Sequence, residues 1–125
     1  MSDREEFPDL QRSARIRLPA EARQESMLYL LSMLAHDDPG IRRRAAGTLG
    51  RLHDAGALDS LIIALRDGDR LVQQAAIGAL GAIGDPRAIV PLRQLHPRVD
   101  RRLQTAIEDA QRAIAARQAG EHILS

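Results

Sequence analysis

The sequence predicts an all-α fold, a right-handed α-solenoid of stacked helical hairpins with about five main helices. The main observation is an internal repeat: residues 38–65 align with residues 69–95 when Leu49-Gly50 is placed on Leu80-Gly81, 31 residues further along. A period of about 20 to 50 residues is typical of solenoids, whose units bury their apolar faces against their neighbours. Composition agrees: 44% of residues are hydrophobic and only 2% aromatic, so the core consists of Leu, Ile and Ala, which suits closely packed helices.

The other matches at this spacing join residues of the same type: Asp38 with Asp69, Ile41 with Val72, Ala45 with Ala76, Asp54 with Asp85, Ala57 with Ala88 and Leu61 with Leu92. Agreement at so many positions indicates that both segments form the same helical hairpin.

The chain divides into three parts. Residues 1–17 mix acidic and basic side chains and predict a flexible arm, residues 18–118 form the repeat domain, and residues 119–125 form a frayed tail. The N-terminus lacks the apolar core of a signal peptide, and the longest apolar run, residues 27–31, is far shorter than a membrane span. There is no cysteine, which excludes thiol chemistry. We therefore expect a cytoplasmic protein without membrane contact.

Each helix carries its own boundary signals. A helix over residues 19–35 matches the second helix of an earlier, incomplete unit, because Met27, Leu30 and Leu34 fall on Leu58, Leu61 and Leu65. Asp38 and Asp69 are predicted to cap the first helix of each of the two following hairpins. Their buried stripes are predicted at Ile41, Ala45, Leu49 and Leu52, and at Val72, Ala76, Leu80 and Ile83.

The last helix is expected from about Arg98 to Arg117, with Gly120 as its terminator. Its apolar stripe comprises Leu103, Ala106, Ile107, Ala110 and Ile114, and its other face is polar, as the end of a solenoid requires. Four glycines recur inside predicted helices at the repeat spacing, and we interpret them as points of close helix approach: Gly47, Gly50, Gly78 and Gly81.

The repeated strings DPGIRRRAAGTLGRLHDAGALDSLIIAL and DRLVQQAAIGALGAIGDPRAIVPLRQL resemble the short HEAT-like repeats of the phycobilisome-lyase type, and GDPRAIVPL is the most diagnostic part. The resemblance covers about residues 27–116. It implies HEAT-like hairpins but leaves the activity open, since relatives of this class include interaction scaffolds, bilin-attachment factors, a di-iron hydroxylase and DNA-repair proteins.

The sequence predicts no catalytic or metal site and no cofactor. The resemblance would place iron ligands of the hydroxylase relatives at Arg43-Arg44 and Gln74-Ala75, which cannot bind iron. The adjacent donor pairs His36-Asp37 and His53-Asp54 fall in turns between helices, and we interpret them as cap and loop residues. No nucleophile lies in a triad pattern.

A basic run, Arg42, Arg43 and Arg44, is one candidate binding patch, for a phosphate backbone or an acidic partner. The alternative is that Arg42 and Arg43 are solvated and Arg44 lies over apolar neighbours. With a net charge of +1 and one tyrosine for stacking, nucleic acid is not the expected partner.

The second helices carry the preferred candidate site. In the HEAT-like solenoids that this sequence resembles, the second helices line the concave side. Several side chains on these helices are more apolar than a solvated face requires. The repeat spacing groups Leu28, Asp59 and Val90 in one row, Tyr29, Ser60 and Pro91 in another, and Ser32, Ile63 and Gln94 in a third. The alternative is that the apolar members complete the core under the N-terminal arm or in a dimer.

We therefore expect a non-enzymatic scaffold module, a monomer or weak homodimer, that binds a partner protein through the concave face. The protein-binding residues would be Leu28, Tyr29, Ser32, Asp59, Ile63, Val90 and Gln94. A second possibility is an accessory subunit of a bilin lyase or isomerase acting with a partner chain, and a third is phosphate-backbone binding through Arg42–Arg44.

Overall fold

A computed structural model describes the backbone of residues 20–124 and the side chains of residues 24–120. The predicted arm over residues 1–17 lies outside this range. The described residues form six α-helices, where the sequence predicted about five: α2 (Ala20–Met33), α3 (Pro39–Leu52), α4 (Leu58–Ala64), α5 (Arg70–Ile83), α6 (Ile89–Leu95) and α7 (Arg101–Leu124). None of these helices has the length and apolarity to cross a membrane.

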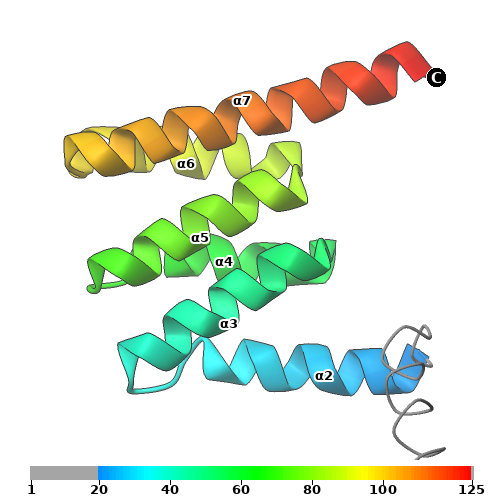
Figure 1. Ribbon diagram of the computed structural model, residues 1–125, viewed down its shortest axis with the longest axis vertical. Helices are drawn as coiled ribbons and strands as arrows, with labels where there is room; N and C mark the ends of the chain where they lie inside the picture. The colour runs from blue at the N-terminus through cyan, green and yellow to red at the C-terminus, as the bar shows by residue number, and fades with distance from the viewer. Residues whose placement is uncertain (1–19, 125) are drawn as a thin grey trace, which may run out of the picture.

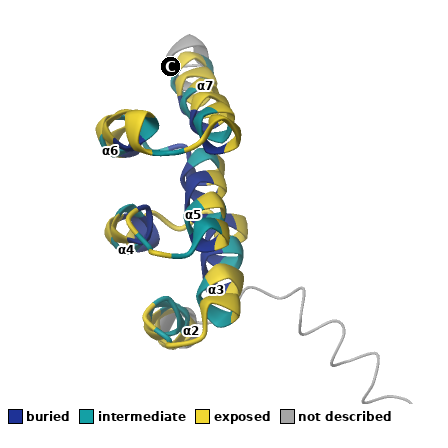
Figure 2. Cartoon of the chain, turned by 90° about the vertical axis from the view of Figure 1, so that its left-hand side faces the viewer, coloured by how far each residue is buried: buried dark blue, intermediate teal, exposed yellow. Residues whose placement is uncertain are grey.

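The helices stack in chain order, with α2 at one end and α7 at the other (Figure 1). They lie in two layers: α3, α5 and α7 form the first-helix layer, and α2, α4 and α6 form the second-helix layer (Figure 2). The core lies between the layers and between successive units. This arrangement confirms the predicted all-α solenoid of helical hairpins.

Aspartate caps begin each helix of the first-helix layer and recur every 31 residues. The Asp38 carboxylate accepts a hydrogen bond from the Gly40 amide at 2.8 Å, and that of Asp69 accepts from the Leu71 and Val72 amides at 2.9 and 3.1 Å. Asp100 accepts from the Leu103 amide at 3.0 Å. These bonds satisfy N–H groups that have no partner within the helix. The repeat therefore has a third, partial copy that begins at Asp100.

This third cap corrects the predicted bounds of the last helix. Helix α7 begins at Arg101 rather than near Arg98, because residues 96–98 form a separate 3₁₀ turn. It also continues to Leu124 instead of ending near Arg117, so Gly120 does not terminate it. The predicted stripe is confirmed at its strongest positions, since Leu103, Ile107, Ala110 and Ile114 are all buried.

Helix α3 departs from the predicted pattern at its ends. Ala45 and Leu49 are buried as expected, but Ile41 is only half-buried and Leu52 is 53% exposed. The equivalent of Leu52 in the next unit, Ile83, is 5% exposed. Periodicity along a helix identifies its apolar side, but a side chain at the helix end is buried only where a neighbouring unit covers it.

Two of the four helical glycines mark close contacts. A Cβ at Gly50 would lie 2.7 Å from the Cα of Ala79, and one at Gly81 would lie 3.1 Å from the Cα of Ala110. These contacts join α3 to α5 and α5 to α7 at equivalent positions. The interpretation was wrong for Gly47 and Gly78: a Cβ at Gly78 would meet nothing within 4 Å, and at Gly47 only the Arg51 side chain at 3.7 Å.

Candidate functional site

The second-helix face is the side of α2, α4 and α6 that does not pack on the first-helix layer (Figure 2). The predicted protein-binding residues all belong to these three helices and are all exposed. Four large apolar side chains stand out by their exposed fractions: Leu28 at 60%, Tyr29 at 65%, Ile63 at 74% and Val90 at 51%. Scattered exposed apolar residues are normal, but several on one layer of one small domain indicate an interaction surface.

Two grooves lie on this face, between successive second helices. The α4–α6 groove has a volume of about 540 Å³ and is lined by Ile62, Leu65, Arg66, Pro91, Gln94, Leu95, Pro97 and Arg98. The α2–α4 groove has a volume of about 430 Å³ and is lined by Leu31, Leu34, Ala35, Ser60, Ile63, Ala64, Arg66 and Asp67. The two sets of lining residues correspond at the 31-residue spacing, so the grooves are one feature of the repeat seen twice.

The grooves exist because the two layers pack differently. In the first-helix layer, Gly50 and Gly81 allow close approach of the next helix. The second helices touch each other far less than the first helices do. The space that remains between them is open to solvent and floored by apolar side chains.

The structure divides the predicted site residues into groups. Ile63 and Gln94 line the two grooves at equivalent positions, as do Ser60 and Pro91. Leu28, Asp59 and Val90 form the row that lines neither groove, although all three are exposed. The predicted set therefore combines residues of the groove walls with a row of residues that lies outside both grooves.

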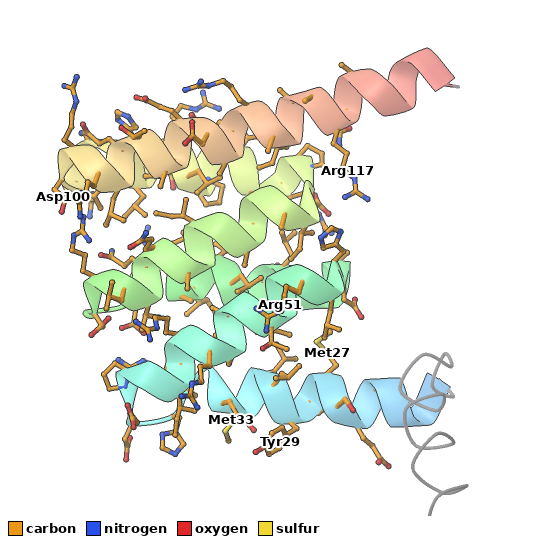
Figure 3. All side chains as sticks on the ribbon, in the orientation of Figure 1. Met27, Tyr29, Met33, Arg51, Asp100 and Arg117 are labelled. Carbon is orange, nitrogen blue, oxygen red and sulfur yellow. The ribbon has the colours of Figure 1, made fainter. Side chains whose placement is uncertain are left out.

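Tyr29 and Ser32 occupy the groove-wall positions of α2, but no unit precedes α2 in the described chain. Tyr29 accordingly points away from the stack, as does Met33, whereas Met27 points towards α3 and the core (Figure 3). The Ser32 hydroxyl donates a hydrogen bond to the Tyr29 carbonyl at 2.6 Å. Tyr29 and Ile63 therefore do not line the same groove.

The basic run does not form a single patch, because Arg42 is engaged. Its guanidinium makes a bidentate pair with Asp67, at 2.9 Å from Nε and 3.0 Å from Nη2. Nη1 also donates to the carbonyls of His36 and Asp37, at 2.7 and 2.9 Å. Four of the five N–H donors of an arginine are thus used. The expectation that Arg42 is solvated was wrong, and only Arg43 and Arg44 remain exposed in that run.

Hydrogen bonding and local charge set the pKa of Asp67. Burial acts to raise it, but hydrogen bonds from Arg42 and from the Asp69 amide outweigh burial, so the pKa of Asp67 lies below its usual value. Asp67 therefore stays ionised and its charge is matched by Arg42.

Arg42 belongs to a series that the sequence comparison did not reveal. The equivalent residues, Gln73 and Gln104, donate from Nε2 to the carbonyls of Leu65 and His96 at 2.9 and 3.0 Å. In each unit, a long polar side chain on the first helix thus bonds a carbonyl at or beyond the end of the preceding second helix. The position is Arg in one copy and Gln in the other two, which hid the match.

The groove cations were also missed by the sequence reasoning. Arg66 lines both grooves and Arg98 lines the α4–α6 groove. Among the described residues, neither side chain has an ion pair or hydrogen bond partner, and no carboxylate lines the α4–α6 groove. Nowhere in the described chain do three potential ligands gather to hold a metal ion.

A stack of helical hairpins with a grooved second-helix layer defines an α-solenoid of the HEAT class. The HEAT repeats family matches residues 27–119, and the chain belongs to this family. The resemblance to HEAT-like repeats is thereby confirmed, and HEAT repeats indicate a protein-interaction module.

One curated relative is the bilin biosynthesis protein PecE of Nostoc sp. (strain PCC 7120 / SAG 25.82 / UTEX 2576). It is 46% identical over 56 residues, which make up 44% of this chain and 22% of that protein. The match thus spans less than a quarter of the relative's length. It contradicts our expectation that the chain has no enzymatic role, because the relative is named for a biosynthetic activity.

Proposed function

We propose that this chain binds a partner protein through its second-helix face, and that it serves as an accessory subunit of an enzyme that acts on bilins. The observation that carries the first part is the exposure of Ile63, 74% at the wall of the α2–α4 groove. The 430 and 540 Å³ grooves lie on the same face, and Leu28 and Val90 add exposed apolar side chains to it. An exposed apolar surface over several units is what a partner would cover.

The similarity to PecE supports the enzymatic context. That relative is named for bilin biosynthesis, and 46% identity over 56 residues is the observation behind this part of the proposal. In the accessory role that we propose, a partner chain takes part in the chemistry. The alternative of phosphate-backbone binding has less support, since the Arg42 guanidinium is already paired with Asp67.

Affinity co-purification from the native cell tests the binding site. We expect Ile63→Asp to lower recovery of the partner about tenfold or more, the effect of losing a central apolar contact. The matched control is Leu71→Asp, which places the same charge at an apolar residue that is 46% exposed on helix α5 of the other layer. Both variants should keep the far-UV circular dichroism of the wild type. Equal recovery with the two variants would exclude the second-helix face as the binding site.

The same eluate tests the enzymatic context. A partner that carries a bilin absorbs visible light. The visible absorbance of the eluate should therefore rise and fall with the amount of partner protein recovered across the variants. A colourless partner with no bilin after denaturing extraction would contradict the accessory-subunit proposal while leaving the interaction surface intact.

A further inference from the structure

We infer that the α4–α6 groove receives an acidic peptide segment of the partner protein, with an apolar side chain on the groove floor and carboxylates paired with Arg66 and Arg98. This inference rests on the function proposed above, because it specifies the chemistry of the segment that the second-helix face recognises. It follows from the floor of the groove, the charges at its rim and its repetition along the face.

The floor is apolar and large enough for side chains of a partner. Ile62, Leu65 and Leu95 contribute aliphatic surface, and Pro91 and Pro97 add rigid apolar walls. The volume of about 540 Å³ is several times the ~150 Å³ cavity that can hold a benzene molecule. Covering this floor with an apolar side chain removes it from water, which is the main favourable contribution to association.

The rim carries positive charge without a matching negative charge. Arg66 and Arg98 have no ion-pair partner among the described residues, and no carboxylate lines this groove. Asp67 lies next to Arg66 in sequence, but its carboxylate is held by the bidentate pair with Arg42. A guanidinium binds a carboxylate in a planar two-bond geometry, so an acidic segment complements this rim and a basic one is repelled.

The α2–α4 groove extends the complementarity to a peptide segment. Arg66 lines both grooves, and Ile63 stands on the wall of the α2–α4 groove. A segment that crosses α4 can place one apolar side chain in each groove and a carboxylate between them, at Arg66. The order of groups that this face recognises is therefore apolar, acidic, apolar, with a further acidic group at Arg98.

Fluorescence anisotropy with two labelled peptides tests the inference directly. One peptide is a short amphipathic sequence of leucine, alanine and glutamate, and the other has lysine in place of every glutamate. We expect the glutamate peptide to bind, with an affinity that falls as salt is added, and the lysine peptide to bind at least tenfold more weakly. Equal binding of the two peptides would overturn the inference.

Variants locate the binding. Arg66→Glu should weaken binding of the glutamate peptide about tenfold, and Arg98→Glu should act in the same direction. The matched control is Arg93→Glu, the same change at an exposed arginine of α6 that does not line either groove. If Arg93→Glu weakens binding as much as Arg66→Glu, then net charge and not the groove attracts the peptide, and the inference fails.

A second probe separates a peptide from a small dicarboxylate. Biliverdin, a linear tetrapyrrole with two carboxylates, is titrated into the protein and followed by its visible absorption. Binding of biliverdin that Arg66→Glu abolishes, together with no binding of the glutamate peptide, would assign the groove to a pigment and overturn the peptide inference. If Ile63→Asp lowers recovery of the partner in co-purification but Arg66→Glu does not, this inference is wrong, while the proposed function is still supported.

Discussion

Gly50 offers the sharpest test of how the solenoid is held together. In Gly50→Ala the new Cβ would lie 2.7 Å from the Cα and 2.8 Å from the Cβ of Ala79 on α5. The obstructing Cα is a backbone atom, so helices α3 and α5 must move apart to make room. Overpacking of this kind costs about 1–3 kcal/mol, whereas replacing a mid-helix glycine by alanine gains about 1 kcal/mol in helix propensity. We expect a net loss of up to about 2 kcal/mol.

Gly78→Ala is the matched control within the same fold. Gly78 is also inside a helix, but a Cβ there would meet nothing within 4 Å, so only the propensity gain of about 1 kcal/mol applies. The difference between the two variants isolates the overpacking cost of about 1–3 kcal/mol. For a domain of roughly 100 residues, each kcal/mol shifts the melting temperature by about 4–8 °C.

Thermal and urea unfolding followed by circular dichroism measure this difference. Gly81→Ala should fall between the two variants, because its Cβ would lie 3.1 Å from the Cα of Ala110. If Gly50→Ala and Gly78→Ala melt at the same temperature, the close contact between α3 and α5 does not limit the side chain at position 50 and the reasoning is refuted.

Three further outcomes are expected. His53 ends α3 with φ of 52°, a left-handed conformation that glycine adopts at lower cost, so His53→Gly should stabilise the protein by about 1 kcal/mol in urea unfolding; an unchanged or lower stability would contradict this. Arg42→Ala should lower the melting temperature by leaving Asp67 unpaired, and Arg43→Ala should not; equal effects would show that the pairing does not matter. Hydrogen bonds from Arg70 lower the pKa of Asp100 to about 2, so the stability from this pair is present above the unfolded pKa of about 3.9 and is lost as pH falls towards 2. In Arg70→Gln the melting temperature should therefore fall less steeply as pH is lowered from about 4 to about 2. The change should be small because the pair is half-exposed, and an identical dependence of melting temperature on pH would refute the linkage.

The sequence was sufficient for the parts of the fold that repeat locally. The caps at Asp38 and Asp69 and the buried positions Leu49 and Leu80 could be found because each depends on residues within one helix or its turn. Comparing two copies then removed the ambiguity of any single pattern. The same comparison missed Asp100, because the third copy agrees with the other two at too few positions to be recognised as a repeat.

The other features of the fold depend on contacts between units, which cannot be predicted from the sequence of one helix. Leu52 is exposed and Ile83 is buried, although their positions in the repeat are the same. Ile83 lies at the end of α5, where the longer helix α7 continues alongside and its Gln118 side chain donates a hydrogen bond to the Gly84 carbonyl. Gly50 and Gly78 look alike in a helical sequence, but only Gly50 faces another backbone. Arg42 lies 25 residues from Asp67 along the chain, and the turn between units brings them together.

The candidate site is a consequence of the same packing difference. Glycine–alanine contacts hold the first-helix layer together at Gly50 and Gly81, and the second helices, which make no such contacts, leave a groove between each pair. The residues that line a groove therefore come from two units, and Ile62 and Leu65 could be recognised in the sequence only as apolar helix positions. Each further hairpin of this type would add one groove and could add one rim residue such as Arg66. A solenoid of this kind can thus gain grooves without changing its core, because the tight layer holds the units together and the open layer carries the surface that we propose for binding.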